Sequence, residues 1–222
     1  MSLEPALLES GVDPAYAPGI AHFGSLLLEA NRRFNLTGAE TEMELLPHLL
    51  DALTLVPYIT ESLLDIGSGG GLPAIPLAIA TGVPATLIES NAKKAGFLRS
   101  VGEELGLPLA VLPNRAETAA RDETLRDRFA CATARAVSTA PTVLELTAPF
   151  LRIGGVALLQ RGRLEERERN AVADAAPMLA AVLENEVALE GDRRILIVRK
   201  TGTTPHRFPR RNGIPEKRPL CF

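Results

Sequence analysis

The chain has 222 residues, of which 46% are hydrophobic, enough for one domain with a sizeable core, with or without an appendage. A net charge of −3 argues against a strongly basic nucleic-acid binder, and the two distant cysteines, Cys131 and Cys221, show no metal-ligand spacing. No stretch is long and apolar enough to span a bilayer, and the acidic residues 1–9 lack the basic start of a signal peptide. We therefore expect a cytoplasmic protein that binds neither a membrane nor a metal.

Residues 1–60 are predicted to form a helical cap in front of a sheet domain. Apolar residues recur at helical spacing through Ala21–Leu28 and again through Met43–Val56. Between these segments, Asn35–Gly38 has the composition of a turn, because asparagine and threonine are good capping residues and glycine can take a positive φ.

The most informative stretch of the chain is Leu63–Pro73. An apolar run ends in Asp65, and glycines follow at every second position, Gly67, Gly69 and Gly71, before a segment with helical spacing. This pattern predicts a strand, a tight turn and a helix start. Because glycine has no Cβ and tolerates positive φ, a ligand can lie against bare backbone there. The spacing is similar to the first turn of methyltransferases that use S-adenosylmethionine (AdoMet).

The same turn also fits a second class of ligand site. Gly69–Ala74 matches the Gly-x-Gly-x-x-Gly/Ala fingerprint of dinucleotide-binding proteins, a pattern that is weak by itself. Asp65 favours AdoMet, because its carboxylate would repel a pyrophosphate and suits the ammonium group of a methionine moiety. Two alternatives stay open: a dinucleotide site, and a glycine-rich turn that serves only the path of the chain.

From Leu63 onward, short apolar runs alternate with helical segments, which predicts a parallel sheet with helical crossovers. The predicted strands are Leu63–Ile66, Ala85–Glu89, Leu109–Leu112, Phe129–Thr133, Val156–Gln160, Val187–Leu189 and Arg194–Lys200. The predicted helices are Leu72–Ala80, Lys93–Leu105, Pro141–Leu151 and Glu165–Val182. Only residues 190–193 separate the last two strands, too few for a crossover helix, so these strands should form an antiparallel hairpin.

We therefore predict a doubly wound, mostly parallel, seven-stranded α/β sheet of the class I, Rossmann-like methyltransferase type, with an antiparallel last strand. The helical cap of residues 1–60 precedes this domain, which spans residues 61–200. Residues 201–222 are predicted to form an irregular tail, because prolines interrupt any regular structure there. From Arg199 to Phe222, seven basic residues and one acidic residue give a charge of +6, which leaves −9 for the rest of the chain.

Polar residues follow neighbouring strands at the carboxyl edge of the predicted sheet, where a doubly wound sheet binds its ligand. Glu89 ends the second strand and is placed to accept hydrogen bonds from both ribose hydroxyls, as NAD sites also do. The loop Asn114–Glu117 follows the third strand and is placed to reach an adenine ring. Arg135 follows the fourth strand, where a guanidinium can bind a carboxylate or phosphate. Surface charges and a salt bridge at the rim are the structural alternatives.

Basic residues indicate where an anion would bind. Lys93 and Lys94 lie in the first turn of a predicted helix that Asn91 can cap, an unfavourable place for cations unless they face an anion such as RNA phosphate. The positive charge of the tail likewise suggests a local electrostatic footprint. Ordinary solvated lysines, and a tail that only aids solubility, remain the alternatives.

A series of short motifs extends over nearly the whole chain: Asn31–Thr37, His48–Asp51, Leu64–Pro73, Ile75–Ile79, Glu89–Ser90, Lys93–Lys94, Phe97–Leu98, Arg115–Glu117, Ala134–Ala136 and Phe208–Pro215. In this order and spacing they resemble the glucose-inhibited division protein B family, bacterial methyltransferases that act on 16S ribosomal RNA. The chain departs from the family pattern at Pro47, which stands where an arginine usually precedes His48 and so removes a candidate RNA contact.

The resemblance implies AdoMet-dependent formation of 7-methylguanosine in the 16S rRNA, near the decoding region. It implies cofactor contacts from Gly67, Leu72, Ala116, Glu117 and Arg135, with Asp65, Gly69, Gly71 and Glu89 nearby. The basic residues expected to track RNA phosphates are Lys93, Lys94, Arg161, Arg163, Arg207, Arg210 and Arg211. We expect 16S rRNA or the small ribosomal subunit as the partner and a monomeric protein.

The chemistry that this family performs needs no catalytic acid or base. N7 of guanine carries a free lone pair and no proton, so it can attack a sulfonium methyl group once the reactants are aligned. We therefore expect Arg135 and the loop that contains Glu117 to position the reactants rather than to transfer protons. The alternative functions are an NAD-dependent or metabolite-modifying Rossmann enzyme, and an RNA-binding module without catalytic activity.

Overall fold

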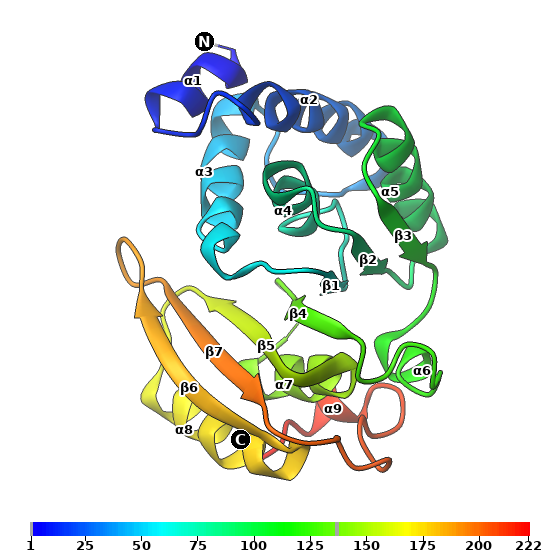
Figure 1. Ribbon diagram of the computed structural model, residues 1–222. Coiled ribbons are helices and arrows are strands. Elements are labelled where there is room, and N and C mark those ends of the chain that lie inside the picture. The colour runs from blue at the N-terminus through cyan, green and yellow to red at the C-terminus, as the bar shows by residue number, and fades with distance from the viewer. Residues whose placement is uncertain (1, 136–137) are drawn as a thin grey trace.

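The computed structural model describes residues 2–135 and 138–222 and contains a seven-stranded sheet with helices on both faces (Figure 1). The strand order is β3-β2-β1-β4-β5-β7-β6. The strands are β1 Leu63–Ile66, β2 Ala85–Ile88, β3 Leu109–Leu112, β4 Phe129–Thr133, β5 Leu151–Arg161, β6 Ala181–Ala188 and β7 Arg194–Lys200. β1 to β5 run parallel, whereas β7 lies between β5 and β6 and is antiparallel to both. The predicted α/β sheet and its antiparallel hairpin are confirmed.

Helices cover both faces of this sheet. They are α1 Leu3–Glu9, α2 Ala17–Phe34, α3 Glu42–Leu53, α4 Ala74–Thr81, α5 Ala92–Glu104, α6 Ala116–Ala119, α7 Ala140–Thr147, α8 Glu166–Ala175 and α9 Ile214–Lys217, with short 3-10 turns at Val56–Tyr58, Ala148–Phe150 and Ala176–Leu179. The helices α2 to α5 lie on one side, and α7 to α9 lie on the other (Figure 1). Among the helices of the described residues, none combines the length and apolar character needed to cross a membrane.

Two apolar cores, one on each face, follow from the alternation of side chains along the strands. Leu63 and Leu158 belong to the core under the N-terminal helices, whereas the next residues, Leu64 and Leu159, belong to the core under α7 and α8. Strands covered on both faces read as continuous apolar runs. For this reason β1, β4 and β7 have the bounds that the sequence predicts. β3 also has its predicted bounds, although it is an edge strand whose residues are only partly buried or exposed.

The N-terminal helices share the first of these cores with the sheet. Phe23 and Leu27 of α2 and Leu49 of α3 are fully buried in it. α2 ends at the predicted turn, where Asn31 holds the loop: its amide oxygen accepts the backbone N–H groups of Leu36 at 2.6 Å and of Thr37 at 2.9 Å. This hydrogen-bonded loop lies next to the turn that follows β1.

The helix predicted over Glu165–Val182 is shorter in the structure. α8 ends at Ala175, Pro177 lies in the 3-10 turn that follows, and β6 begins at Ala181. The apolar residues keep helical spacing through the 3-10 turn, so the sequence did not indicate where α8 ends. The predicted strand Val187–Leu189 covers only the end of β6. The middle of β6 is exposed and polar, so its strand pattern is weak.

The helix predicted over Pro141–Leu151 is also too long. α7 ends at Thr147, a 3-10 turn containing Pro149 follows, and Leu151 is the first residue of β5. The predicted strand Val156–Gln160 is therefore only the second half of β5. The sequence analysis missed the first half because residues 152–154 are exposed and include Gly154, so no apolar run marks it.

The C-terminal tail is less irregular than the sequence predicts. Phe208 and Leu220 are 3% and 7% exposed and insert into the second core, and residues Ile214–Lys217 form α9. Gly213, with a φ of 75°, precedes this helix. The tail therefore packs against α7 and lies close to α6 (Figure 1).

Candidate cofactor-binding site

The turn between β1 and α4 requires glycine for its backbone conformation. Gly67, Gly69 and Gly71 have φ values of 68°, 53° and 92°, which residues with a side chain rarely adopt. The turn is closed by the backbone N–H of Gly71, which donates to the carbonyl oxygen of Ser68 at 2.6 Å. The spacing of alternate glycines in the sequence thus corresponds to alternate left-handed residues in the structure.

Gly70 is glycine for a different reason. A Cβ there would lie 2.9 Å from the carbonyl oxygen of Leu36 and 2.9 Å from the side chain of Leu27. α2 and the loop after it therefore press against the back of the turn, where a side chain would not fit. The N-terminal helices thereby fix the position of the turn.

Asp65 lies beneath this turn and is fully buried. Its Oδ1 accepts a hydrogen bond from Thr133 Oγ1 at 2.8 Å, whereas its Oδ2 has no hydrogen-bond partner in residues 2–135 and 138–222. Burial raises the pKa of Asp65 to about 7, although its hydrogen bonds and the charge of Arg135 oppose the rise. A buried carboxylate with a free oxygen is suited to a cationic or N–H-bearing group of a ligand.

Glu89 is the first residue after β2, and its carboxylate joins two loops. It accepts the backbone N–H of Gly69 at 2.9 Å and that of Asn91 at 2.7 Å. Asn91 caps α5, as predicted, because its side chain accepts the N–H groups of Lys93 and Lys94. Glu89 is thus held in one orientation, with acceptor positions left for ligand hydroxyls.

Two cavities open along the carboxyl edge of the sheet and meet at Gly67. The first, the turn cavity, has a volume of about 350 Å³, and its lining includes Leu36, His48, Gly69, Leu72, Lys94 and Arg135. The second, the loop cavity, has a volume of about 120 Å³, and its lining includes Ile88, Ser90, Asn114, Ala116, Glu117 and Glu216. Within the described residues, no group of three or more His, Cys, Asp or Glu side chains is arranged to hold a metal ion.

The residues predicted to bind the cofactor divide between these cavities. The turn cavity brings together Gly67, Gly69, Leu72 and Arg135, and the loop cavity brings together Gly67, Ala116 and Glu117. Asp65, Gly71 and Glu89 stand behind the walls and support them.

Arg135 follows β4, as predicted, but its guanidinium already has partners in the chain. It donates to the carbonyl oxygen of His48 at 3.1 Å and lies 3.5 Å from Asp51 Oδ2. Asp51 also accepts from Arg193, in the turn between β6 and β7, at 2.8 Å. Burial lowers the pKa of Arg135, and Asp51 and Asp65 oppose that change. Arg135 therefore links α3 to the sheet at the edge of the turn cavity.

Glu117 and the tail meet at the loop cavity, a contact that the sequence analysis missed. Glu117 Oε1 accepts the backbone N–H of Gly213 at 2.8 Å. Pro215 and Glu216 then contribute to the lining of the cavity. The proline-rich composition of the tail gave no indication of this placement.

The basic residues expected to contact RNA fall into two groups. Lys93, Arg163, Arg207 and Arg211 are exposed, and Lys94 lines the turn cavity. Arg161 and Arg210 are instead held in ion pairs, Arg161 with Glu168 at 2.9 Å and Arg210 with Glu145 at 2.6 Å. The structure does not support the expectation that these two arginines are free to bind phosphate, because carboxylates of the chain occupy them.

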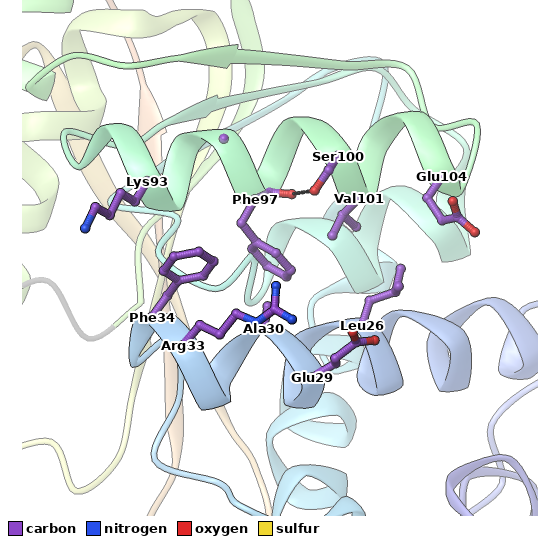
Figure 2. A pocket seen from close by; sticks show the side chains of 11 residues that line it. Leu26, Glu29, Ala30, Arg33, Phe34, Lys93, Phe97, Ser100, Val101 and Glu104 are labelled. Carbon is purple, nitrogen blue, oxygen red and sulfur yellow. Dashed lines mark hydrogen bonds between the residues drawn. The ribbon is translucent and has the colours of Figure 1, made fainter.

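A groove that the sequence did not predict runs between α2 and α5, with a volume of about 480 Å³ (Figure 2). Lys93 and Phe34 lie at one end of it, and Glu104 and Leu26 lie at the other. Phe34 is 39% exposed, which is unusual for a large aromatic side chain. The basic end adjoins the turn cavity, because Lys93 and Phe34 are close in the chain to residues that line that cavity.

The strand order, the glycine turn and the cavities at the carboxyl ends of the parallel strands define the Rossmann-like methyltransferase class of fold. An O-methyltransferase from Bacillus cereus, solved in complex with S-adenosylhomocysteine (SAH), matches with a TM-score of 0.59 and 19% identity, over 81% of this chain and 91% of that chain. A T. thermophilus 16S rRNA methyltransferase, solved with AdoMet and guanosine, matches with a TM-score of 0.51 and 19% identity, over 72% of this chain and 40% of that chain. These identities are low, so the likeness shows the fold alone.

Sequence comparison defines the particular family. The GidB model, described as rRNA small subunit methyltransferase G, matches residues 18–197. The protein named ribosomal RNA small subunit methyltransferase G of Pelotomaculum thermopropionicum is 40% identical over 208 residues, which covers 88% of this chain and 87% of that protein. The protein of the same name in Deinococcus deserti is 38% identical over 229 residues, with 96% and 93% covered. The chain belongs to the GidB family of rRNA small subunit methyltransferases, which confirms the resemblance of its motifs.

Proposed function

We propose that this chain transfers the methyl group of AdoMet to N7 of a guanine in the 16S rRNA of the small ribosomal subunit, forming 7-methylguanosine. The observation that carries the proposal is the buried Asp65 carboxylate, one oxygen of which has no partner in the described residues, beneath a glycine turn that Glu89 braces. Membership of the GidB family supports RNA of the small subunit as the substrate.

The residues at the turn fit AdoMet better than a dinucleotide. Asp65 carries its charge directly behind the turn, where it would attract the ammonium group of the methionine part, and Glu89, which braces the same turn, would lie next to the ribose hydroxyls. A dinucleotide would bring its pyrophosphate to the turn, where Glu89 already occupies the Gly69 N–H and adds a negative charge. The adenine part belongs in the loop cavity, next to Ala116. AdoMet, when bound, supplies an electrophilic methyl group on a positively charged sulfur.

The residues of the turn cavity have positioning roles in this reaction. Because guanine N7 has a lone pair and no proton, the step needs alignment rather than a base. Burial, together with the charge of Arg135, lowers the pKa of His48, which favours a neutral imidazole in the lining of the turn cavity, where a cationic sulfonium would bind. Lys94 lines the same cavity and is suited to hold a phosphate next to the target base, whereas Arg135, paired with Asp51 and with the carbonyl oxygen of His48, fixes the wall of the cavity.

The groove between α2 and α5 supplies a path for the RNA (Figure 2). N7 of guanine faces the deep major groove of A-form RNA, so the base must come from a loop or be flipped out. Phe34 is exposed at the end of the groove next to the turn cavity and can stack a neighbouring base, while Lys93 can bind its phosphate.

Methyl transfer to RNA tests the proposal directly. Small-subunit rRNA and assembled small subunits are incubated with methyl-labelled AdoMet, and the labelled nucleoside is identified by mass spectrometry. We expect label in 7-methylguanosine with at least one of the two substrates. Calorimetry with AdoMet and NAD accompanies the assay. Binding of NAD in place of AdoMet, or label in a different nucleoside, would contradict the proposal.

We further propose that the protein acts as a monomer, because elements of a single chain form both cavities. We also propose that it acts in the cytoplasm, because its relatives are named as methyltransferases of ribosomal RNA. Sedimentation equilibrium at the concentrations used in the assay should give one chain per particle. A stable dimer would contradict this part of the proposal and leave the reaction itself untouched.

A further inference from the structure

A buried ion pair anchors the C-terminal tail to α7. Glu145 is fully buried, and its carboxylate accepts the backbone N–H of Arg210 at 2.8 Å and the guanidinium at 2.6 to 3.1 Å. The same guanidinium donates to the carbonyl oxygen of Arg218 at 2.6 Å, which joins two parts of the tail. Hydrogen bonds between charged groups in a fixed geometry hold a segment in one position.

Arg126 provides a second anchor for the tail. This arginine is 5% exposed and donates to the carbonyl oxygens of Phe208 at 3.1 Å and Thr204 at 2.9 Å. The side chains of Phe208 and Leu220 are buried in the second apolar core. The tail is therefore fixed before and after the segment that reaches the loop cavity.

That segment forms part of the wall of the loop cavity. Gly213 donates its backbone N–H to Glu117 Oε1 at 2.8 Å, although the two residues are 96 positions apart in the sequence. Thr142 Oγ1 donates to the carbonyl oxygen of Pro215 at 2.9 Å. Pro215 and Glu216 line the cavity together with the loop that contains Glu117.

We propose that Gly213–Glu216 is part of the cofactor site: it closes the adenosine end with Pro215 and Glu216 and orients Glu117 through the Gly213 N–H. The inference rests on the proposed function, because AdoMet is the ligand assigned to the loop cavity. Glu117 and Glu216 both border this cavity. Carboxylates accept hydrogen bonds, so they suit the exocyclic amine of a purine and would repel a phosphate.

The structure favours this role over that of a free RNA-binding arm. The tail does expose Arg207 and Arg211, but a free arm would not be anchored, whereas the Arg210 guanidinium between them is bound to a buried carboxylate. The acidic wall at Glu216 also opposes phosphate at this end of the cleft. The tail thus acts as a positioning element for the cofactor.

The test removes the ion pair that anchors the tail and substitutes none of the residues that line the loop cavity. The Glu145→Gln/Arg210→Gln double variant removes the ion pair without leaving an unpaired buried charge. Calorimetry is performed with SAH and with 5′-methylthioadenosine, which lacks the amino-acid part. We expect the dissociation constants of both ligands to rise about five- to tenfold, by the same factor, because the lost contacts lie at the adenosine end. The KM for AdoMet should rise by a similar factor while kcat at saturating AdoMet stays unchanged.

A matched control and a second measurement complete the design. His206→Gln alters a tail side chain that is 78% exposed, and it should bind both ligands as the wild type does. In the wild type, SAH should slow amide hydrogen exchange at residues 213–217 and leave residues 190–193 unchanged, a result that needs no variant to fold. Unchanged exchange at 213–217, or wild-type dissociation constants in the folded double variant, would overturn the inference. A wild type that binds neither ligand would overturn the proposed function as well.

Discussion

The two ends of the chain border the same cleft, and different forces attach them to it. At the N-terminal end, Phe23 and Leu27 are fully buried in an apolar core that supports the glycine turn. At the C-terminal end, the buried Glu145 binds Arg210, and Arg126 binds backbone carbonyls. Apolar packing is non-directional, whereas charged hydrogen bonds impose one geometry. The first attachment supports the turn cavity, and the second shapes the loop cavity.

One truncation on each side should give the largest effects. Phe23→Ala should lower the free energy of unfolding by about 4 kcal/mol, because it leaves a cavity at a fully buried position. Arg210→Ala should lower it by about 3 kcal/mol, because Glu145 remains buried without its partner. Urea unfolding followed by circular dichroism measures both.

A second substitution distinguishes the two attachments. Adding Glu145→Gln to Arg210→Ala should recover about 1 kcal/mol or more, because a neutral amide is less costly to bury than a carboxylate. The same substitution should give no recovery in the Phe23→Ala background, since the lost contact there is apolar. Arg210→Ala protein as stable as the wild type would show that the ion pair does not hold the tail.

Gly71→Ala tests the N-terminal attachment, in which apolar side chains pack against the glycine turn. Gly71 has a φ of 92°, and a Cβ would lie 2.6 Å from Ile75 and 3.4 Å from Phe23. We expect a loss of about 3 kcal/mol from strain and overlap, with weaker AdoMet binding. Gly82→Ala is the matched control, because its φ is 68° and no atom lies within 4 Å of the added Cβ; it should cost about 1 kcal/mol. Equal losses would mean that backbone conformation alone requires glycine at the turn.

The same contrast explains how much of the fold the sequence could predict. The strands β1, β4 and β7 have their predicted bounds because apolar runs with both faces covered are a local signal. β6 is an edge strand in which Glu184, Asn185 and Glu186 are exposed, so strand periodicity is lost. Two helices were predicted too long because a 3-10 turn continues the helical spacing of apolar residues.

The residues of the candidate site also fall into two groups, those that local sequence could predict and those that depend on a long-range contact. The glycine turn and Glu89 are set by the residues around them, so their positions could be predicted from a short stretch of sequence. The contribution of Pro215 and Glu216 depends on Arg210 meeting Glu145, 65 positions away in the sequence. A charge pattern does not distinguish an arginine that faces a carboxylate from one that faces RNA, because both occur in basic segments.

Asp65 makes the N-terminal half of the site sensitive to pH. Burial raises its pKa to about 7, so the carboxylate that we propose attracts the ammonium group of AdoMet is largely protonated at pH 6. Binding favours the ionised form, so affinity rises with pH: AdoMet should bind about five- to eightfold more weakly at pH 6 than at pH 7.5. Calorimetry at both pH values, in buffers of different ionisation enthalpy, measures the affinity and the protons released.

Two controls restrict this pH effect to Asp65. Asp65→Asn keeps an acceptor for the Thr133 hydroxyl and should lose most of the dependence. 5′-Methylthioadenosine lacks the ammonium group, so its affinity should be nearly constant over this range in both proteins. An affinity of wild-type protein for AdoMet that does not change with pH would falsify the pairing.

The smallest expected effect is on the salt dependence of RNA binding. Here we compare a substitution in the groove between α2 and α5 with one in the C-terminal tail. Lys93→Gln removes an exposed cation from the groove between α2 and α5 and should reduce the slope of log affinity against log salt by about 1. The Glu145→Gln/Arg210→Gln variant should leave the slope unchanged, because Glu145 already neutralises Arg210. Filter binding of rRNA over a range of salt concentrations measures both slopes. A reduced salt slope in the tail variant, with an unchanged slope in Lys93→Gln, would place the RNA along the tail. Glu216 would then face RNA phosphates, which contradicts its proposed place beside the adenosine.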